Sequence, residues 1–113
     1  MLEIGERPWG TYYVLADEPH YKLKRIVVNP GGKLSYQYHH KRQEQWTIIE
    51  GNATIVLNDE QISLGYGQSI FIPQGAKHRI MNLTDQPVTF IEVQTGTYFG
   101  EDDIVRLEDE YLR

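Results

Sequence analysis

Apolar and polar residues alternate along short segments of this chain, and each segment ends at a cluster of turn-forming residues. Tyr21 to Val28 alternates in this way and stops at Asn29-Pro30-Gly31-Gly32, a combination that interrupts regular pairing. The other segments with this character are 12–15, 33–39, 44–50, 53–57, 62–64, 69–72, 78–82 and 88–95. Alternation with period two is the pattern of a half-buried β-strand. The sequence therefore predicts an all-β sandwich or barrel of about nine short strands.

Helical periodicity is absent from most of the chain. No window before residue 100 shows the apolar stripe that an amphipathic helix needs. The charged tail from Asp102 to Arg113 is the segment for which we expect a short terminal helix. The chain has 113 residues without a linker, a low-complexity stretch or an internal repeat. We therefore expect a single domain over 1–113.

Composition and charge narrow the classes of partner. The formal charge is 11 − 16 = −5, which weighs against non-specific binding to nucleic acid or to an anionic membrane surface. This balance still permits a local basic pocket for an anionic metabolite. The chain has no cysteine, which excludes a disulfide scaffold, a thiolate metal site and a cysteine nucleophile.

Targeting segments are not evident in the sequence. The first ten residues carry charges and lack an apolar run, so we expect no signal peptide. No stretch approaches the roughly 20 apolar residues of a membrane-spanning helix. We therefore expect a cytoplasmic protein with no membrane partner.

Residues that bind metals recur at regular distances from glycines and a proline. Gln37, His39 and Glu44 lie between Gly31 and Gly51. A second segment contains Gly67, Pro73, Gly75, His78 and Asn82. Both segments resemble the two motifs of the cupin superfamily at every spacing, except that Gln37 stands where the first motif normally has a histidine. The resemblance implies a double-stranded β-helix, the cupin jelly-roll barrel, with one divalent metal ion on Gln37, His39, Glu44 and His78.

Strand geometry supports this ligand set independently. Side chains alternate across a strand, so Gln37 and His39 face one side, whereas His40 has the opposite parity. Two imidazoles, a carboxylate and an amide oxygen suit a hard or borderline divalent ion with open coordination positions. Zinc, manganese, iron, cobalt and nickel all fit, and the ligand types alone do not choose among them.

A narrower resemblance covers nearly the whole chain. The stretches that carry it are Arg7-Pro8-Trp9-Gly10-Thr11-Tyr12, Tyr21 to Ile26, Leu34 to His39, Arg42, Glu44, Trp46, Ile91-Glu92-Val93-Gln94, Gly96, Tyr98 and Gly100 to Arg106. They resemble the type II phosphomannose isomerase domain. In that family the domain usually follows a mannose-1-phosphate guanylyltransferase domain, which we expect to be absent here. Departures from the family pattern are Tyr36, Lys41 and Gln45.

The resemblance implies a reaction, an ion and a metabolic role. The reaction interconverts mannose 6-phosphate and fructose 6-phosphate in mannose and polysaccharide precursor metabolism. Distantly related type I phosphomannose isomerases hold zinc with a similar Gln-x-His, Glu and His set, which makes zinc the favoured ion and explains Gln37. Aldose–ketose isomerisation needs an electrophile that polarises the sugar oxygens and a base that moves a proton between C2 and C1.

Several residues are candidates for contact with such a substrate. Glu92 is the candidate base, provided that its strand turns it inward. Cations suited to the phosphate are Lys22, Lys24, Arg42 and Arg79. Trp46 and Ile48 share the parity of Glu44 and are expected to form the pocket wall. The alternatives are a solvated charged face for the cations and simple barrel core for Trp46 and Ile48.

The sequence also leaves open two alternative functions and predicts an oligomeric state. The same barrel could act as a non-catalytic binder of a sugar phosphate or nucleotide sugar, or as a metal-dependent cupin oxygenase. We also expect a homodimer, since small cupins commonly pair by extending a sheet. In this hypothesis Arg7 to Tyr13 crosses to the partner as an edge strand, and the acidic tail from Glu101 to Glu110 packs across the interface.

Overall fold

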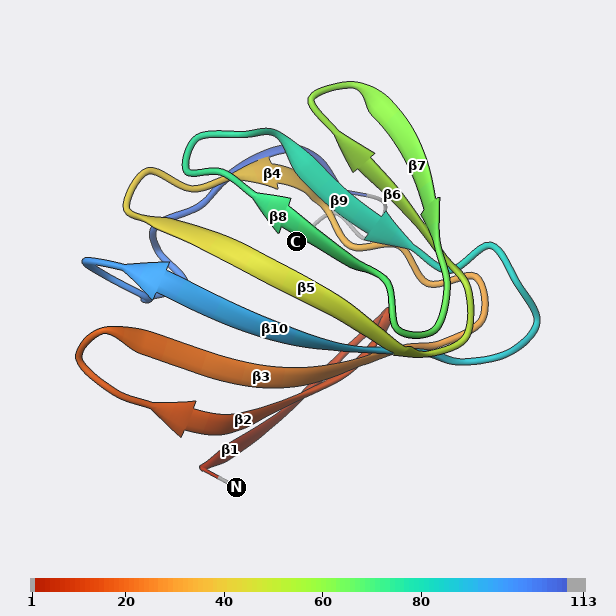
Figure 1. Cartoon of the computed structure of the whole chain (residues 1–113), viewed down its shortest axis with the longest axis horizontal. Helices are drawn as coiled ribbons and strands as arrows, with labels where there is room; N and C mark the ends of the chain where they lie inside the picture. Colours follow the sequence, from red (N-terminus) through yellow and green to blue (C-terminus); the bar gives the residue numbers. More distant parts are fainter. Residues whose placement is uncertain (1, 110–113) are drawn as a thin grey trace.

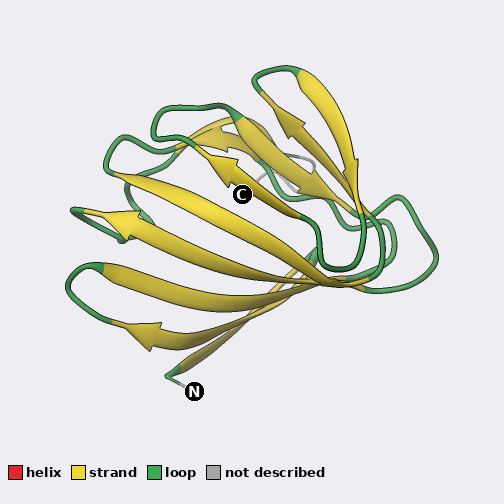
Figure 2. Cartoon of the chain, in the orientation of Figure 1, coloured by secondary structure: helices red, strands yellow, loops and turns green. Residues whose placement is uncertain are grey.

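The computed structural model describes residues 2–109, which form eleven β-strands and no helix (Figure 2). The strands are β1 Glu3–Arg7, β2 Gly10–Asp17, β3 Tyr21–Val28, β4 Tyr36–Tyr38, β5 Arg42–Glu50, β6 Ala53–Leu57, β7 Glu60–Leu64, β8 Ser69–Ile72, β9 His78–Met81, β10 Val88–Gly96 and β11 Val105–Glu108. All of their pairings are antiparallel. The predicted all-β class is confirmed.

The strands form two sheets that face each other. One has six strands in the order β1-β2-β3-β10-β5-β8, and the other has five in the order β11-β4-β9-β6-β7. Figure 1 shows β3, β10 and β5 side by side in the first sheet, with β9, β6 and β7 in the second. From β3 onward the chain passes repeatedly from one sheet to the other. This winding is that of the predicted double-stranded β-helix.

Burial alternates along the central strands and divides the interior into two ends. On β10 the inward residues are Val88 and Phe90, followed by Glu92 and Gln94. The neighbouring β5 runs antiparallel to β10, and Phe90 lies opposite Ile48 while Gln94 lies opposite Glu44. One end of the barrel is therefore an apolar core, and the other end collects buried polar side chains.

Gly96 allows the chain to turn beside the loop between β4 and β5. Its φ angle is +146°, and a Cβ at this position would collide with the carbonyl oxygen of Lys41. Thr97 then donates its backbone N–H to the same oxygen at 3.0 Å. Glycine is required here by both conformation and space. The turn directs residues 97–104 across the polar end of the barrel.

The two ends of the described chain differ from the sequence prediction. Strand β1 was not predicted, because only Gly5 of this short, charged edge strand is buried. The terminal helix is wrong for residues 102–109, where β11 pairs with β4. Its order Val105, Arg106, Leu107, Glu108 alternates with period two, which favours a strand. Residues 110–113 lie outside the described residues.

The segment expected to reach a partner chain pairs within its own chain. Arg7 pairs with Gly10 across a hairpin turn, and β2 lies between β1 and β3. Glu101, from the tail expected at the interface, forms an ion pair with Lys24 of the same chain. The homodimer and the segments expected at its interface stay predictions. No helix among residues 2–109 is long and apolar enough to span a membrane.

Candidate functional site

His39, Glu44 and His78 converge at the polar end of the barrel. His39 follows β4, Glu44 lies on β5 and His78 opens β9. His39 Nε2 is 3.4 Å from Glu44 Oε2, and His78 Nε2 is 3.8 Å from Glu44 Oε1. One ligand atom from each residue lies within 4.8 Å of the others, and all three side chains are buried. A metal ion could be held between these atoms.

Backbone carbonyl groups fix the orientation of both imidazoles. His39 Nδ1 donates to Asp103 O at 2.6 Å, and His78 Nδ1 donates to Ala76 O at 2.9 Å. A carbonyl oxygen can only accept, so each Nδ1 carries the proton and each Nε2 presents its lone pair towards Glu44. Among residues 2–109, the buried His78 Nε2 has no hydrogen-bond partner. Such a buried, unpaired acceptor suits a metal ligand.

The imidazoles are held neutral. Burial, together with the charge of Arg42, lowers the pKa of His39 to about 4. Burial likewise lowers the pKa of His78. Neutral imidazole is the form that binds metal ions. At neutral pH both rings are therefore ready to act as ligands without first losing a proton.

Arg42 lies buried beside this group. Its Nε donates to Glu44 Oε2 at 3.0 Å, and its Nη2 lies 3.2 Å from His39 Nε2. The guanidinium therefore compensates the buried carboxylate and fixes the orientation of Glu44, since charge-assisted hydrogen bonds of this kind are short and directional.

Gln37, the fourth predicted ligand, lies next to His78. It is directly opposite His78 in the β4–β9 pairing, so both side chains lie on the same face of the sheet. Its amide oxygen accepts a hydrogen bond from Ser35 Oγ at 2.9 Å. The structure thus brings His39, Glu44 and His78 together and holds Gln37 opposite His78, with its amide oxygen hydrogen-bonded to Ser35.

Glu92 is linked to Glu44, one of the three possible metal ligands, through a hydrogen-bond donor of Trp46. The indole Nε1 of Trp46 lies 3.0 Å from Glu44 Oε1 and 3.1 Å from Glu92 Oε1. Gln94 Nε2 donates to the other Glu92 oxygen at 2.8 Å. Burial raises the pKa of Glu92 to about 7, and the charge of Glu44 adds to the rise. Glu92 faces inward, as a base in this site must.

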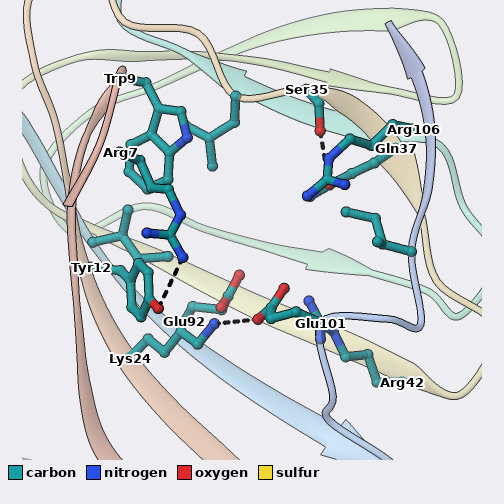
Figure 3. A pocket seen from close by; sticks show the side chains of 13 residues that line it. Arg7, Trp9, Tyr12, Lys24, Ser35, Gln37, Arg42, Glu92, Glu101 and Arg106 are labelled. Atoms are coloured by element: carbon teal, nitrogen blue, oxygen red, sulfur yellow. Dashed lines mark hydrogen bonds and ion pairs between the residues drawn. The ribbon is translucent and has the colours of Figure 1, made fainter. Parts of the chain in front are cut away.

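A pocket of about 130 Å³ opens next to these residues. Figure 3 shows three walls, with Arg7, Trp9 and Tyr12 on one side, Ser35, Gln37 and Arg106 opposite, and Lys24, Glu92, Glu101 and Arg42 between them. Four cations and two carboxylates line the pocket, a formal balance of +2 in a chain of −5. The pocket therefore favours an anionic ligand.

The predicted substrate contacts divide into those that line this pocket and those that do not. Lys24 and Arg42 line it. Lys22 lies on the same face of β3 as Lys24 but is not among the lining residues. Arg79 donates from Nε to Leu34 O at 3.0 Å and pairs with Glu108 at 3.5 Å. Arg79 is thus held away from the pocket, because it follows the inward His78 and so faces the other side of β9.

The predicted wall residues belong to the core. Ile48 is fully buried in the apolar cluster, and Trp46 packs against the rings of Phe90 and His78 with centroid distances of 5.2 and 5.6 Å. Neither residue lines the pocket. Barrel core is therefore the better description of both, and Trp46 reaches the site only through its indole N–H.

Several lining residues were missed as candidates. Arg7, Trp9 and Tyr12 come from the hairpin of β1 and β2, and Glu101 and Arg106 come from the segment after β10. All five fall within the stretches that carry the resemblance to phosphomannose isomerases. Those stretches were therefore the available signal, but the sequence does not show that the two ends of the chain meet.

Sequence comparisons cover almost the whole chain. The family model described as "Mannose-6-phosphate isomerase C-terminal" matches residues 3–109. The xanthan biosynthesis protein XanB of Xanthomonas campestris is 47% identical, and a mannose-1-phosphate guanylyltransferase of Klebsiella pneumoniae is 44% identical, each over 95% of this chain. The alginate biosynthesis protein AlgA of Pseudomonas aeruginosa is 44% identical over the same share. The chain spans only 22–23% of the length of these relatives.

Solved structures show the same fold. A sugar phosphate isomerase of the cupin superfamily from Silicibacter pomeroyi has a TM-score of 0.74 at 21% identity, over 88% of this chain and 76% of its own. A Klebsiella pneumoniae protein with a double-stranded β-helix domain has a TM-score of 0.80 at 21% identity, over 93% and 90%. The cupin fold is thus confirmed. Together with the family match, these findings show that the chain belongs to the mannose-6-phosphate isomerase C-terminal family.

Proposed function

We propose that this chain is a metal-dependent isomerase that interconverts mannose 6-phosphate and fructose 6-phosphate, with one divalent ion on Gln37, His39, Glu44 and His78. One observation carries the proposal. Trp46 Nε1 lies within 3.1 Å of a carboxylate oxygen of both Glu44 and Glu92. A possible metal ligand and a second buried carboxylate therefore lie side by side. Two adjacent carboxylates with different environments suit a ligand and a base.

The donor set fits a divalent ion. Two neutral imidazoles with exposed lone pairs and one carboxylate converge, and His78 Nε2 is a buried acceptor that lacks a partner among the described residues. A bound ion would replace Arg42 as the neighbour of His39 Nε2. The family resemblance favours zinc, while manganese, iron, cobalt and nickel also suit these ligands. The ion supplies a Lewis acid that polarises the sugar oxygens.

Glu92 is the proposed base. With a pKa of about 7 it can accept and return a proton at neutral pH. It would take the proton from C2 of the aldose while the C2–H electron pair forms the C1–C2 double bond and the aldehyde oxygen gains a proton. Loss of the O2 proton and return of the carbon proton to C1 then give the ketose. Trp46 and Gln94 keep the carboxylate in place through this exchange.

The charges of the pocket suit a phosphorylated substrate. Lys24 and Arg42 are buried cations that line it, together with Arg7 and Arg106. A low-dielectric wall increases the attraction of these charges for an anion. A neutral sugar would leave them without a further partner, so we infer that a sugar phosphate is preferred.

The family match supports this substrate. The name of the family refers to mannose-6-phosphate isomerase, and the relatives include proteins of xanthan and alginate biosynthesis. We therefore propose a role in polysaccharide precursor metabolism. The guanylyltransferase named for some relatives concerns proteins about four times as long as this chain. A cytoplasmic location and a homodimer remain predictions from the sequence.

Exchange of Glu92 for glutamine tests the proposal. The chain is loaded in turn with zinc, manganese, cobalt and nickel, and isomerisation of mannose 6-phosphate is followed while elemental analysis gives ion content. We expect turnover with at least one ion, and a loss of about 10²- to 10⁴-fold in Glu92→Gln at unchanged ion content. Glu60→Gln, at an exposed carboxylate on β7, is the matched control.

The main alternative function uses the same pocket to bind a ligand without converting it. A non-catalytic sugar-phosphate binder would hold the ligand and the ion but convert nothing. A native protein that is fully loaded with each ion, binds mannose 6-phosphate and does not isomerise it would support this alternative and overturn the proposed reaction.

A further inference from the structure

The pocket cations differ in whether a carboxylate already neutralises them. Lys24 Nζ is 2.8 Å from Glu101 Oε1, and Arg42 Nε is 3.0 Å from Glu44 Oε2. Arg106 lies beside Gln37 in Figure 3 and has Asp109 at 4.0 Å. Arg7 forms no ion pair with any carboxylate in residues 2–109. Its charge is therefore available to a ligand.

Arg7 is nonetheless held in one place. Its Nη1 donates to the backbone oxygen of Glu6 at 2.8 Å, and its Nη2 donates to the Tyr12 hydroxyl at 3.2 Å. The guanidinium also lies over the Tyr12 ring, 4.9 Å from its centroid. Tyr12 in turn donates to Glu3 Oε2 at 2.8 Å. These contacts use two of the five N–H donors of the guanidinium, so the group is oriented but not saturated.

Trp9 provides a second donor on the same wall. It lines the pocket at 5% exposure, and its indole Nε1 is a buried donor without a hydrogen-bond partner among the described residues. Figure 3 shows Trp9 next to Arg7, across the pocket from Ser35 and Gln37. Buried donors are rarely left unpaired, which points to an acceptor that arrives with a ligand.

The hairpin turn keeps both residues rigidly placed. Arg7 pairs with Gly10 across the turn, and Gly10 has a φ of +152°. A Cβ at Gly10 would collide with the carbonyl oxygen of Val27 on β3. The turn is therefore packed tightly onto the sheet. A rigid support of this kind lowers the cost of ordering a binding residue.

We propose that Arg7 and Trp9 form the subsite for the phosphate group of the substrate, an inference that rests on the proposed function. Arg7 would pair with two phosphate oxygens, and the Trp9 N–H would donate to a phosphate oxygen after a small shift of the ring. The reacting end of the sugar would then lie against Glu92 and Gln37 on the other walls. Arg7 lines the pocket, whereas Lys22 and Arg79 do not.

Binding of a substrate analogue that cannot isomerise tests this subsite. Mannitol 6-phosphate lacks the carbonyl group, so calorimetry of the zinc-loaded full chain measures binding alone. We expect Arg7→Met to weaken this binding about 10- to 100-fold, with Arg7→Lys intermediate. Inorganic phosphate should lose affinity in the same order. Trp9→Phe, which removes only the N–H donor and some area, should weaken binding about 3- to 10-fold.

Arg25→Met is the matched control. Arg25 also stacks on a tyrosine, with its guanidinium 4.2 Å from the Tyr13 centroid, but it does not line the pocket. The Arg25→Met variant should bind mannitol 6-phosphate with the affinity of the native chain. Ion content and circular dichroism are measured for every variant, and Arg7→Lys keeps the test valid if Arg7→Met does not fold.

The possible outcomes distinguish failure of the phosphate subsite from failure of the proposed isomerase function. If native chain and Arg7 variants bind mannitol 6-phosphate within about twofold of each other, the subsite is placed wrongly while the isomerase proposal stands. Equal weakening by Arg25→Met would also overturn the subsite, because the effect would not be specific to this wall. If the loaded native chain binds neither mannitol 6-phosphate nor mannose 6-phosphate, both proposals fail.

Discussion

Replacement of Glu92 by glutamine should change how stability depends on pH. Glu92 is 5% exposed, and its oxygens accept from Trp46 Nε1 and Gln94 Nε2. A glutamine has the same shape and keeps one acceptor. Gln94 now points its Nε2 at Glu92. Once the Gln94 amide turns over, the new amide can donate to Gln94 Oε1, a buried acceptor that has no partner among the described residues. The substitution therefore removes an ionisable group at little cost in packing.

The sign and size of the effect follow from the pKa of Glu92. Burial first, and then the charge of Glu44, raise this pKa from its ordinary 4.5 to about 7. The stability that Glu92 contributes is thus fully present below pH 4.5 and is lost as the pH rises through 7. At about 1.4 kcal/mol per pKa unit, the rise in pKa from 4.5 to about 7 corresponds to a decrease of about 3 kcal/mol in the free energy of unfolding. Most of this decrease falls between pH 5 and pH 9.

Urea unfolding of metal-free protein at a series of pH values measures this loss. Between pH 5 and pH 9, the free energy of unfolding of the native chain should fall by about 2–3 kcal/mol relative to Glu92→Gln. The histidines of the site titrate in both proteins and largely cancel in the difference. Glu60→Gln should follow the native curve. Parallel curves for native protein and Glu92→Gln would refute the argument that burial holds Glu92 near neutrality.

Three further predictions concern the ion, the backbone and the assembly. His78→Ala should lose turnover while its circular dichroism stays native. Its ion affinity should fall by more than the factor of about 10 to 100 that follows from changing a residue behind a metal ligand. Full ion content by elemental analysis would contradict the proposed metal site. Gly96→Ala should destabilise the fold by about 1–3 kcal/mol in urea unfolding, because its φ is +146° and the new Cβ meets Lys41 O, whereas Gly31→Ala, with open space around it, should cost less. Light scattering should give twice the chain mass of 13.2 kDa, and a monomer at tens of micromolar would contradict the homodimer.

The central strands and the metal-type residues could be predicted because their signals are local. Alternation along 21–28 and 88–95 reflects one buried face of each strand, and the structure has β3 and β10 there. The spacing of His39, Glu44 and His78 depends on turns that glycine and proline mark in the sequence. Edge strands lack this signal, since β1 buries only Gly5.

The pocket itself could not be predicted because it depends on long-range pairing. Arg7 reaches the site only because β1 and β2 extend the sheet beside β3, and Glu101 because Gly96 turns the chain towards Lys41. The position of Arg79 relative to His78, however, follows from sequence alternation alone. The alternation that turns His78 inward turns its neighbour outward, so the two side chains lie on opposite faces of β9.

Ion content and turnover measured on one sample test the central claim most directly. The purified chain is stripped with a chelator and reloaded in steps with zinc, and each step is assayed for mannose 6-phosphate isomerisation and for zinc per chain. The account predicts that turnover rises in proportion to bound ion and stops rising at one ion per chain. Turnover that survives complete removal of the ion, or a chain that holds one ion of each candidate metal and stays inactive, would contradict a metal-dependent isomerase.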